Sequence, residues 1–132
     1  MSKIYKTAYR VYYEDTDAGG VVYYANYLKF SERARTDMLR EMGLLQSELI
    51  NEKDILFVVR KVEMDLFKPA KLDNLLEIET EIIEIGAAVI FIKQNIFFEK
   101  IKLSTINVKL AVINGKLRPV RLPLDIKNLF SK

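Results

Sequence analysis

One long amphipathic helix followed by a succession of strands limits the folds open to this chain. Apolar residues recur at steps of three and four, as expected for one buried helix face, at Tyr23, Tyr27, Phe30, Ala34, Met38, Met42 and Leu45. Gly43 is placed to end that helix, so we expect about 17 to 20 helical residues, or about 25–30 Å. A chain of 132 residues has room for a single domain, and this helix therefore needs a sheet to cover its apolar face.

Alternating apolar and polar residues predict five strands, at residues 5–13, 55–67, 75–85, 87–98 and 104–113. Within residues 55–67, Val58, Val62 and Met64 are expected on one face. Short turns at Gly86 and at Asn114-Gly115 imply mostly antiparallel pairing. We therefore expect an α+β fold in which one helix crosses one face of the sheet, with a short helix starting near Pro123.

That arrangement leaves the other face of the sheet uncovered. On the last strand, the residues expected on that face include Thr105, Asn107 and Ala111, which are small or moderately polar. Such a surface suits packing against a second subunit. We therefore expect an oligomer, at least a dimer.

The composition excludes several kinds of chemistry. The chain has no histidine and no cysteine, which rules out Cys/His zinc sites, catalytic triads with histidine and disulfides. A general base working near neutral pH must then be a carboxylate, or a lysine or tyrosine with a strongly lowered pKa. We expect no metal and no cofactor.

The same composition predicts a cytoplasmic protein. The net charge of +3 is spread along the chain, which is not typical of a nucleic-acid-binding protein. No apolar segment is long enough for a membrane span. The first ten residues lack the apolar core of a secretory signal.

The loop before the helix combines acidic residues and glycines, Glu-Asp-Thr-Asp-Ala-Gly-Gly at residues 14–20. The first amides of a helix have no intrahelical partner and carry partial positive charge. They can stabilise a carbonyl oxygen that gains negative charge, while a nearby carboxylate attacks the carbonyl or activates water. The alternative is that Asp15 or Asp17 only caps a turn. A calcium loop is disfavoured, because Gly19 and Asn26 stand where ligands belong.

Residues 13–23, Tyr-Glu-Asp-Thr-Asp-Ala-Gly-Gly-Val-Val-Tyr, closely resemble the hydroxybenzoyl-CoA thioesterase family, as do Asn26, Tyr27, Phe30 and residues 32–35. Within that family the chain is most similar to the acyl-CoA thioesterases associated with the Tol-Pal gene cluster, which residues 57–61 and 69–73 also resemble. The resemblance covers residues 8–125. It implies a hotdog fold, in which a five-stranded, mostly antiparallel sheet wraps a long central helix. It also implies homodimers or homotetramers with active sites at subunit interfaces.

The resemblance also implies roles for individual residues. Asp17 matches the family's catalytic aspartate, either as nucleophile or as general base. The helix start near the amide of Tyr24 polarises the thioester carbonyl, and Tyr13 matches a tyrosine in the site. The further residues expected to bind substrate are Asn26, Tyr27, Val59, Arg60, Lys61 and Lys68.

Two departures from the family pattern affect these expectations. Tyr24 stands where many members of the subgroup have histidine. Residues 84–87, Glu-Ile-Gly-Ala, replace a basic cluster that some members use to bind the CoA phosphates. Arg60, Lys61 and Lys68 are the candidate replacements, and the alternative is that they are solvated charges at the edge of the sheet.

Two classes of function follow. The first is hydrolysis of an acyl-CoA, with an acyl-carrier-protein thioester as the alternative substrate. The second is a binding or scaffold protein that holds acyl-carrier protein in envelope lipid metabolism, which Tyr24 favours and the retained Asp17 disfavours. A hotdog dehydratase is a third option, which the missing histidine disfavours.

Overall fold

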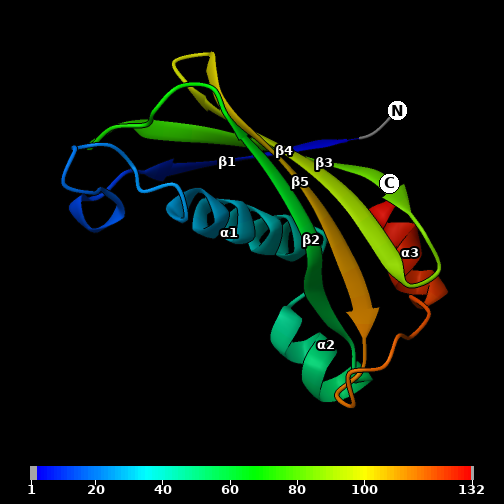
Figure 1. Ribbon diagram of the computed structural model, residues 1–132. Coiled ribbons are helices and arrows are strands. Elements are labelled where there is room, and N and C mark those ends of the chain that lie inside the picture. The colour runs from blue at the N-terminus through cyan, green and yellow to red at the C-terminus, as the bar shows by residue number, and fades with distance from the viewer. Residues whose placement is uncertain (1–2, 132) are drawn as a thin grey trace.

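The computed structural model describes residues 3–131 (Figure 1). The elements along the chain are β1 (Ile4–Arg10), the single 3₁₀ turn η1 (Tyr13–Asp15), α1 (Asn26–Glu41), α2 (Gln46–Lys53), β2 (Leu56–Leu66), β3 (Leu75–Ile85), β4 (Val89–Phe98), β5 (Ile101–Ile113) and α3 (Leu124–Phe130). The five strands lie where the alternation predicts them, with boundaries that differ by up to three residues.

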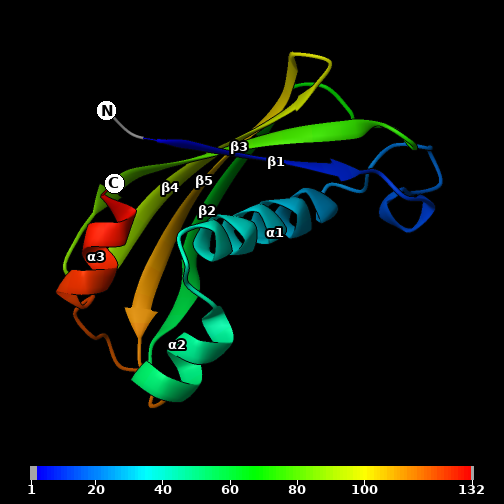
Figure 2. The same cartoon turned by 180° about the vertical axis from the view of Figure 1, so that it is seen from behind.

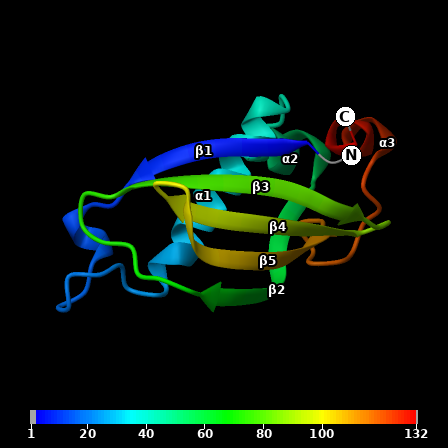
Figure 3. The ribbon, with the colours of Figure 1, turned by 90° about the horizontal axis from the view of Figure 1, so that it is seen from above.

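The strands form one sheet in the order β1-β3-β4-β5-β2, and every neighbouring pair is antiparallel (Figure 3). The sheet curves around α1, which crosses its concave face (Figures 1 and 2). The predicted α+β arrangement is therefore confirmed. The edge strands are β1 and β2.

The core lies between α1 and the concave face of the sheet. The four most deeply buried apolar side chains of α1 belong to the predicted stripe: Tyr27, Phe30, Ala34 and Met38. They meet a layer of β-branched and leucine side chains, which includes Leu76, Ile78, Ile90, Ile92, Ile96, Ile106 and Val108. This contact fixes the direction of α1 across the sheet.

The long helix is shorter than expected. Tyr23 precedes it, because the Tyr23 amide donates to the Asp15 carbonyl (3.0 Å) and so belongs to the loop. Gly43 adopts a left-handed conformation (φ +90°) just after the last turn, as predicted. The helix α2 was not predicted: Leu49 is its one buried residue, and one apolar contact gives no helical periodicity to detect.

The predicted face of Val58 is wrong. Val62 pairs with Val108 on the concave side of β5, whereas Val58 pairs with Ala111, which points the other way. The register shifts between Val59 and Lys61, so Arg60 is the extra residue of a β-bulge. One inserted residue reverses the face of every side chain before it.

The described helices all lie on the concave side of the sheet (Figure 3). The convex face is largely charged, and its residues include Lys6, Glu77, Glu79, Glu81, Lys93 and Lys109. The predicted uncovered face is therefore present, and an oligomer that uses it stays a prediction. Of the described helices, none has the length and apolar character to cross a membrane.

The turn between β4 and β5 generates a prediction about stability. Glu99 (φ 47°) and Lys100 (φ 68°) both adopt left-handed conformations, which cost a residue with a Cβ about 1–2 kcal/mol. We expect Lys100→Gly to raise the free energy of unfolding by about 1 kcal/mol, measured by urea denaturation. Lys116→Gly is the control: Lys116 lies in another exposed turn but has no positive φ, so glycine there should destabilise. A loss of stability in both variants would contradict this interpretation.

Candidate active site

Asp15 holds the loop that precedes α1. Its side chain is buried, and Oδ2 accepts a hydrogen bond from the Tyr12 amide (2.8 Å). Its carbonyl oxygen accepts from the Tyr23 amide (3.0 Å) and from Nδ2 of Asn26 (2.8 Å). Asp15 is thus a structural residue, and it ties the end of β1 to the start of α1.

Asp17 is exposed and has a different environment. Its Oδ1 accepts from the Gly19 amide (2.8 Å). The backbone closes a tight turn, with Asp17 N bonded to Val21 O (2.9 Å) and Gly20 N to Asp17 O (3.0 Å). Gly20 has φ +80°, a conformation that favours glycine. Within residues 3–131, Oδ2 of Asp17 has no hydrogen bond or ion pair.

Asp17 borders a groove of about 400 Å³, called here the Asp17 groove. The groove is lined by the loop, by the start of α1 and by the segment that follows β2: Asp17, Val21, Val22, Tyr23, Tyr24, Tyr27, Leu66, Phe67, Lys68 and Pro69. Four of the residues predicted from the sequence therefore come together here, namely Asp17, Tyr24, Tyr27 and Lys68.

The backbone amide of Tyr24 is free at the start of α1. The first hydrogen bonds of the helical region run from Asn26 N to Tyr23 O (2.8 Å) and from Tyr27 N to Tyr24 O (3.3 Å). In the described part of the chain, the amides of Tyr24 and Ala25 donate to no protein atom. They are the unpaired donors expected at a helix N-terminus, and Tyr24 is one of the residues that line the groove.

The tyrosines of the groove differ in burial and in their contacts. Tyr24 is 58% exposed, and its ring lies 4.8 Å from that of Tyr23 between centroids. A hydrogen-bonding contact with Tyr24 raises the pKa of Tyr23. Tyr27 is buried, and its hydroxyl accepts from the Ala70 amide (3.0 Å). Burial raises the pKa of Tyr27, an effect that the Ala70 amide partly offsets.

The other predicted site residues do not line the Asp17 groove of this subunit. Tyr13 is 81% exposed in η1, and the side-chain amide of Asn26 bonds to the loop. Arg60 forms the β2 bulge. Lys61 pairs with Glu63 (3.0 Å) and faces the convex side opposite Lys109. Their contacts with substrate stay predictions.

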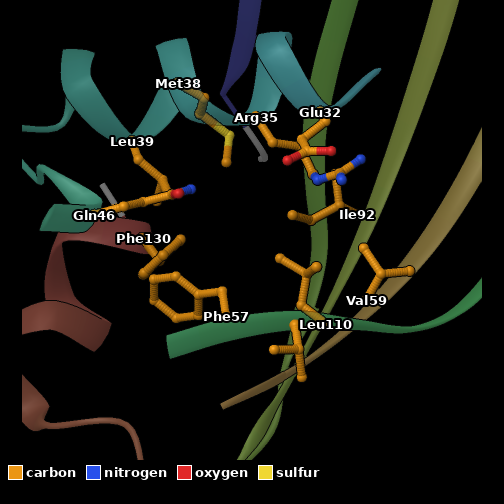
Figure 4. Close-up of a pocket in the computed structure, with 11 residues that line it drawn as sticks. Glu32, Arg35, Met38, Leu39, Gln46, Phe57, Val59, Ile92, Leu110 and Phe130 are labelled. Atoms are coloured by element: carbon orange, nitrogen blue, oxygen red, sulfur yellow. The ribbon is translucent and has the colours of Figure 1, made fainter. Parts of the chain in front are cut away.

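Val59 lines a second cavity, called here the Arg35 pocket (Figure 4). Its volume is about 220 Å³, and it lies between α1, β2 and α3. Sequence analysis missed this pocket. The available clue was an arginine beside Ala34 on the buried face of the predicted helix, where a charge needs partners.

A family model described as the thioesterase superfamily matches residues 19–105, a segment that includes the helix start, α1 and most of the sheet. The chain belongs to the thioesterase superfamily. The predicted resemblance is thereby confirmed at the level of the superfamily.

Curated relatives agree with this membership. The chain is 54% identical over 79 residues to the acyl-CoA thioester hydrolase YbgC of Escherichia coli O6:H1, covering 60% of this chain and 58% of that protein. It is 56% identical over 75 residues to the acyl-CoA thioesterase YbgC of Haemophilus influenzae, covering 57% and 55%. The matched region thus spans less than two thirds of these relatives.

Solved structures extend the similarity to nearly the whole chain. A probable thioesterase from Bartonella henselae is 40% identical, with a TM-score of 0.89, and the match covers 92% of this chain and 100% of that one. A 1,4-dihydroxy-2-naphthoyl-CoA thioesterase from Synechocystis has a TM-score of 0.91 at 20% identity, covering 98% and 97%. The second match shows the fold alone. Together they confirm the hotdog arrangement.

The different environments of the two aspartates give a prediction. Asp15→Ala removes a buried acceptor from the Tyr12 amide and should lower the free energy of unfolding by about 1–2 kcal/mol. Asp17→Ala, at an exposed position of the same loop, should change it by less than about 0.5 kcal/mol. Urea denaturation of both variants measures the difference. Equal losses would show that Asp17 also holds the loop.

Proposed function

We propose that this protein is an acyl-CoA thioesterase in which Asp17 carries out hydrolysis. One observation carries the proposal: Asp17, whose carboxylate has an unpaired oxygen, and Tyr24, whose backbone amide is a free helix N-terminal donor, line the same groove. Membership of the thioesterase superfamily and the names of the relatives support it. In a chain without histidine and cysteine, the Asp17 carboxylate and the Tyr24 amide supply the groups needed to cleave a thioester.

The groups at the groove have complementary roles in the reaction. The Tyr24 amide donates to the carbonyl oxygen of the thioester and stabilises the negative charge that develops there. Asp17 either attacks the carbonyl carbon, forming an anhydride that water then cleaves, or removes a proton from an attacking water. In both cases the C–S bond breaks, a C–O bond from water forms, and the CoA thiolate leaves and takes up a proton.

Lys68 is the candidate cation for the CoA phosphates. It lines the same groove as Asp17, directly after the end of β2. Arg60 and Lys61 lie earlier in β2 and do not line this groove. We expect them to bind the phosphates of a substrate held in the Asp17 groove of another subunit. Lysine binds phosphate as a point charge and needs no fixed geometry, which suits the exposed end of a long cofactor-like substrate.

The outer edge of β2 supports a dimer with shared sites. This strand has eleven residues and, among the described strands, pairs with β5 alone, so its other edge has unpaired backbone groups. Apolar side chains along it are exposed, including Val62 (39%), Leu66 and Phe67. A second copy paired along this edge would cover the open side of the Asp17 groove and bring its own Arg60 and Lys61 nearer. We therefore propose that the active sites lie at a homodimer interface.

A binding or scaffold role is the competing function. The observation that favours it is Tyr24, a neutral phenol where the subgroup often has histidine. A scaffold for acyl-carrier protein would keep the groove but need no carboxylate in it. Turnover measurements on Asp17 variants separate these two functions.

We expect Asp17→Asn to lower kcat for acyl-CoA hydrolysis by at least about 100-fold, because the amide is neither a base nor a nucleophile. The measurement is thiol release with short, long and aromatic acyl-CoAs. The free energy of unfolding should stay within about 0.5 kcal/mol of the wild type. Near-normal turnover in this variant with every substrate would contradict the catalytic role of Asp17.

The proposed dimer predicts a change of mass. Val62→Lys combined with Leu66→Lys places charges on the exposed apolar edge of β2, a pattern that blocks edge pairing in natural sheets. We expect sedimentation at micromolar concentration to give a dimer or tetramer for the wild type and a monomer for the variant. A monomeric wild type that is fully active would contradict the shared site.

A further inference from the structure

The Arg35 pocket combines an apolar lining with a buried cation. Its apolar walls are formed by Met38, Leu39, Phe57, Ile92, Leu110 and Phe130 (Figure 4). The rings of Phe57 and Phe130 meet edge to face with centroids 6.0 Å apart. Arg35 also lines the pocket and is 8% exposed. A charge in such surroundings is costly unless something compensates it.

The neighbours of Arg35 compensate it only in part. Nη1 donates to Ser31 Oγ (2.7 Å) and to Gln94 Oε1 (3.1 Å), which are both neutral acceptors. No carboxylate among residues 3–131 forms an ion pair with the guanidinium. Burial lowers the pKa of Arg35, while the more distant Glu32 counteracts this shift. Arg35 is thus a cation without a paired anion.

One side of the guanidinium remains available. Nε and Nη2 of Arg35 donate no hydrogen bond within the described residues. Neither belongs to the fully buried side-chain atoms that lack a partner, so both keep some exposure, and Arg35 is a residue that lines the pocket. Two adjacent N–H donors form a fork that matches the two oxygens of a carboxylate.

The pocket lies within reach of the Asp17 groove along α1. Because Nη1 bonds to Ser31, the guanidinium lies about one turn before its own Cα, as side chains on helices commonly do. Ser31 follows Tyr24 by seven residues, or about 10 Å of helix. Tyr24, Leu28 and Glu32 succeed one another at steps of four along an exposed row between the two sites. Leu28 gives that row an apolar surface (36% exposed).

On the basis of the proposed hydrolase activity, we propose that the Arg35 pocket binds the far end of the acyl group and that this end carries a carboxylate. The preferred substrates are mono-CoA thioesters of medium-length dicarboxylic acids. Their thioester carbonyl lies at the Tyr24 amide, their methylene groups pass over Leu28, and their free carboxylate pairs with Nε and Nη2 of Arg35. Hydrolysis breaks the C–S bond, adds water across it and releases the dicarboxylate and CoA.

A substitution of Glu32 gives a second, independent test of the pairing between Arg35 and a substrate carboxylate. Glu32 lines the pocket but is exposed, so it can be changed without opening the core. Its negative charge repels a bound carboxylate. Glu32→Gln should therefore strengthen the preference for dicarboxylic substrates, whereas Arg35→Lys keeps the positive charge but removes the fork and should weaken it.

The test compares kcat/KM for adipoyl-CoA and suberoyl-CoA with hexanoyl-CoA and octanoyl-CoA, which have the same numbers of carbon atoms. We expect wild type to prefer the dicarboxylic member of each pair by about 10- to 100-fold, the range for a hydrogen bond to a charged group. Arg35→Lys should reduce this ratio by at least about 10-fold, and Glu32→Gln should increase it. A purely structural Arg35 would lower both rates together and leave the ratio unchanged.

A binding measurement on the Asp17→Asn protein gives a readout that needs no turnover. Calorimetry should show adipate binding more tightly than hexanoate, with the difference lost when Arg35→Lys is added. Equal rates and equal affinities for the two members of each pair would overturn the inference, as would a carboxylate of a second subunit bound to Arg35. If hexanoyl-CoA is hydrolysed without such a preference, the proposed function stands. If no acyl-CoA is hydrolysed, the proposed function fails.

Discussion

The contact between α1 and the concave face of the sheet determines where every group of the candidate site lies. Tyr27, Phe30, Ala34 and Met38 are almost completely buried in that contact, so α1 has neither freedom to rotate nor freedom to slide. Tyr24, just before α1, therefore lies at the Asp17 groove, and Arg35 lies in the second pocket. The chemistry at the surface depends on packing inside, as expected when a site is built on a rigid element.

The loop before α1 depends on the same contact, and it places two carboxylates in different environments. Each carboxylate accepts one backbone amide through one oxygen, but Asp15 is buried inside the loop, whereas Asp17 is exposed at the groove. The two carboxylates therefore differ in burial. The buried one stabilises the loop, and the exposed one remains accessible from the groove.

Much of this could be predicted from the sequence, because strand alternation and helical periodicity reflect burial directly. The five strands, the stripe of α1 and the glycine after it follow from such patterns, and the long motif around Asp17 indicated the superfamily. The misses have a common cause. The side on which Val58 faces depends on an inserted residue, α2 buries a single leucine, and Arg35 gains its partners from Ser31 and Gln94 only after the chain has folded. None of these three features produces a periodic pattern of apolar residues in the sequence.

The bulge at Arg60 has a consequence for how the chain behaves in a crowded solution. A flat, exposed strand edge can template the addition of strand upon strand, which is how amyloid fibrils grow. The extra residue interrupts the hydrogen-bonding row of β2 and sharpens its local twist, so an incoming strand can match only the part of the edge on one side of the interruption. The bulge thereby limits the length of edge that a further strand can pair with.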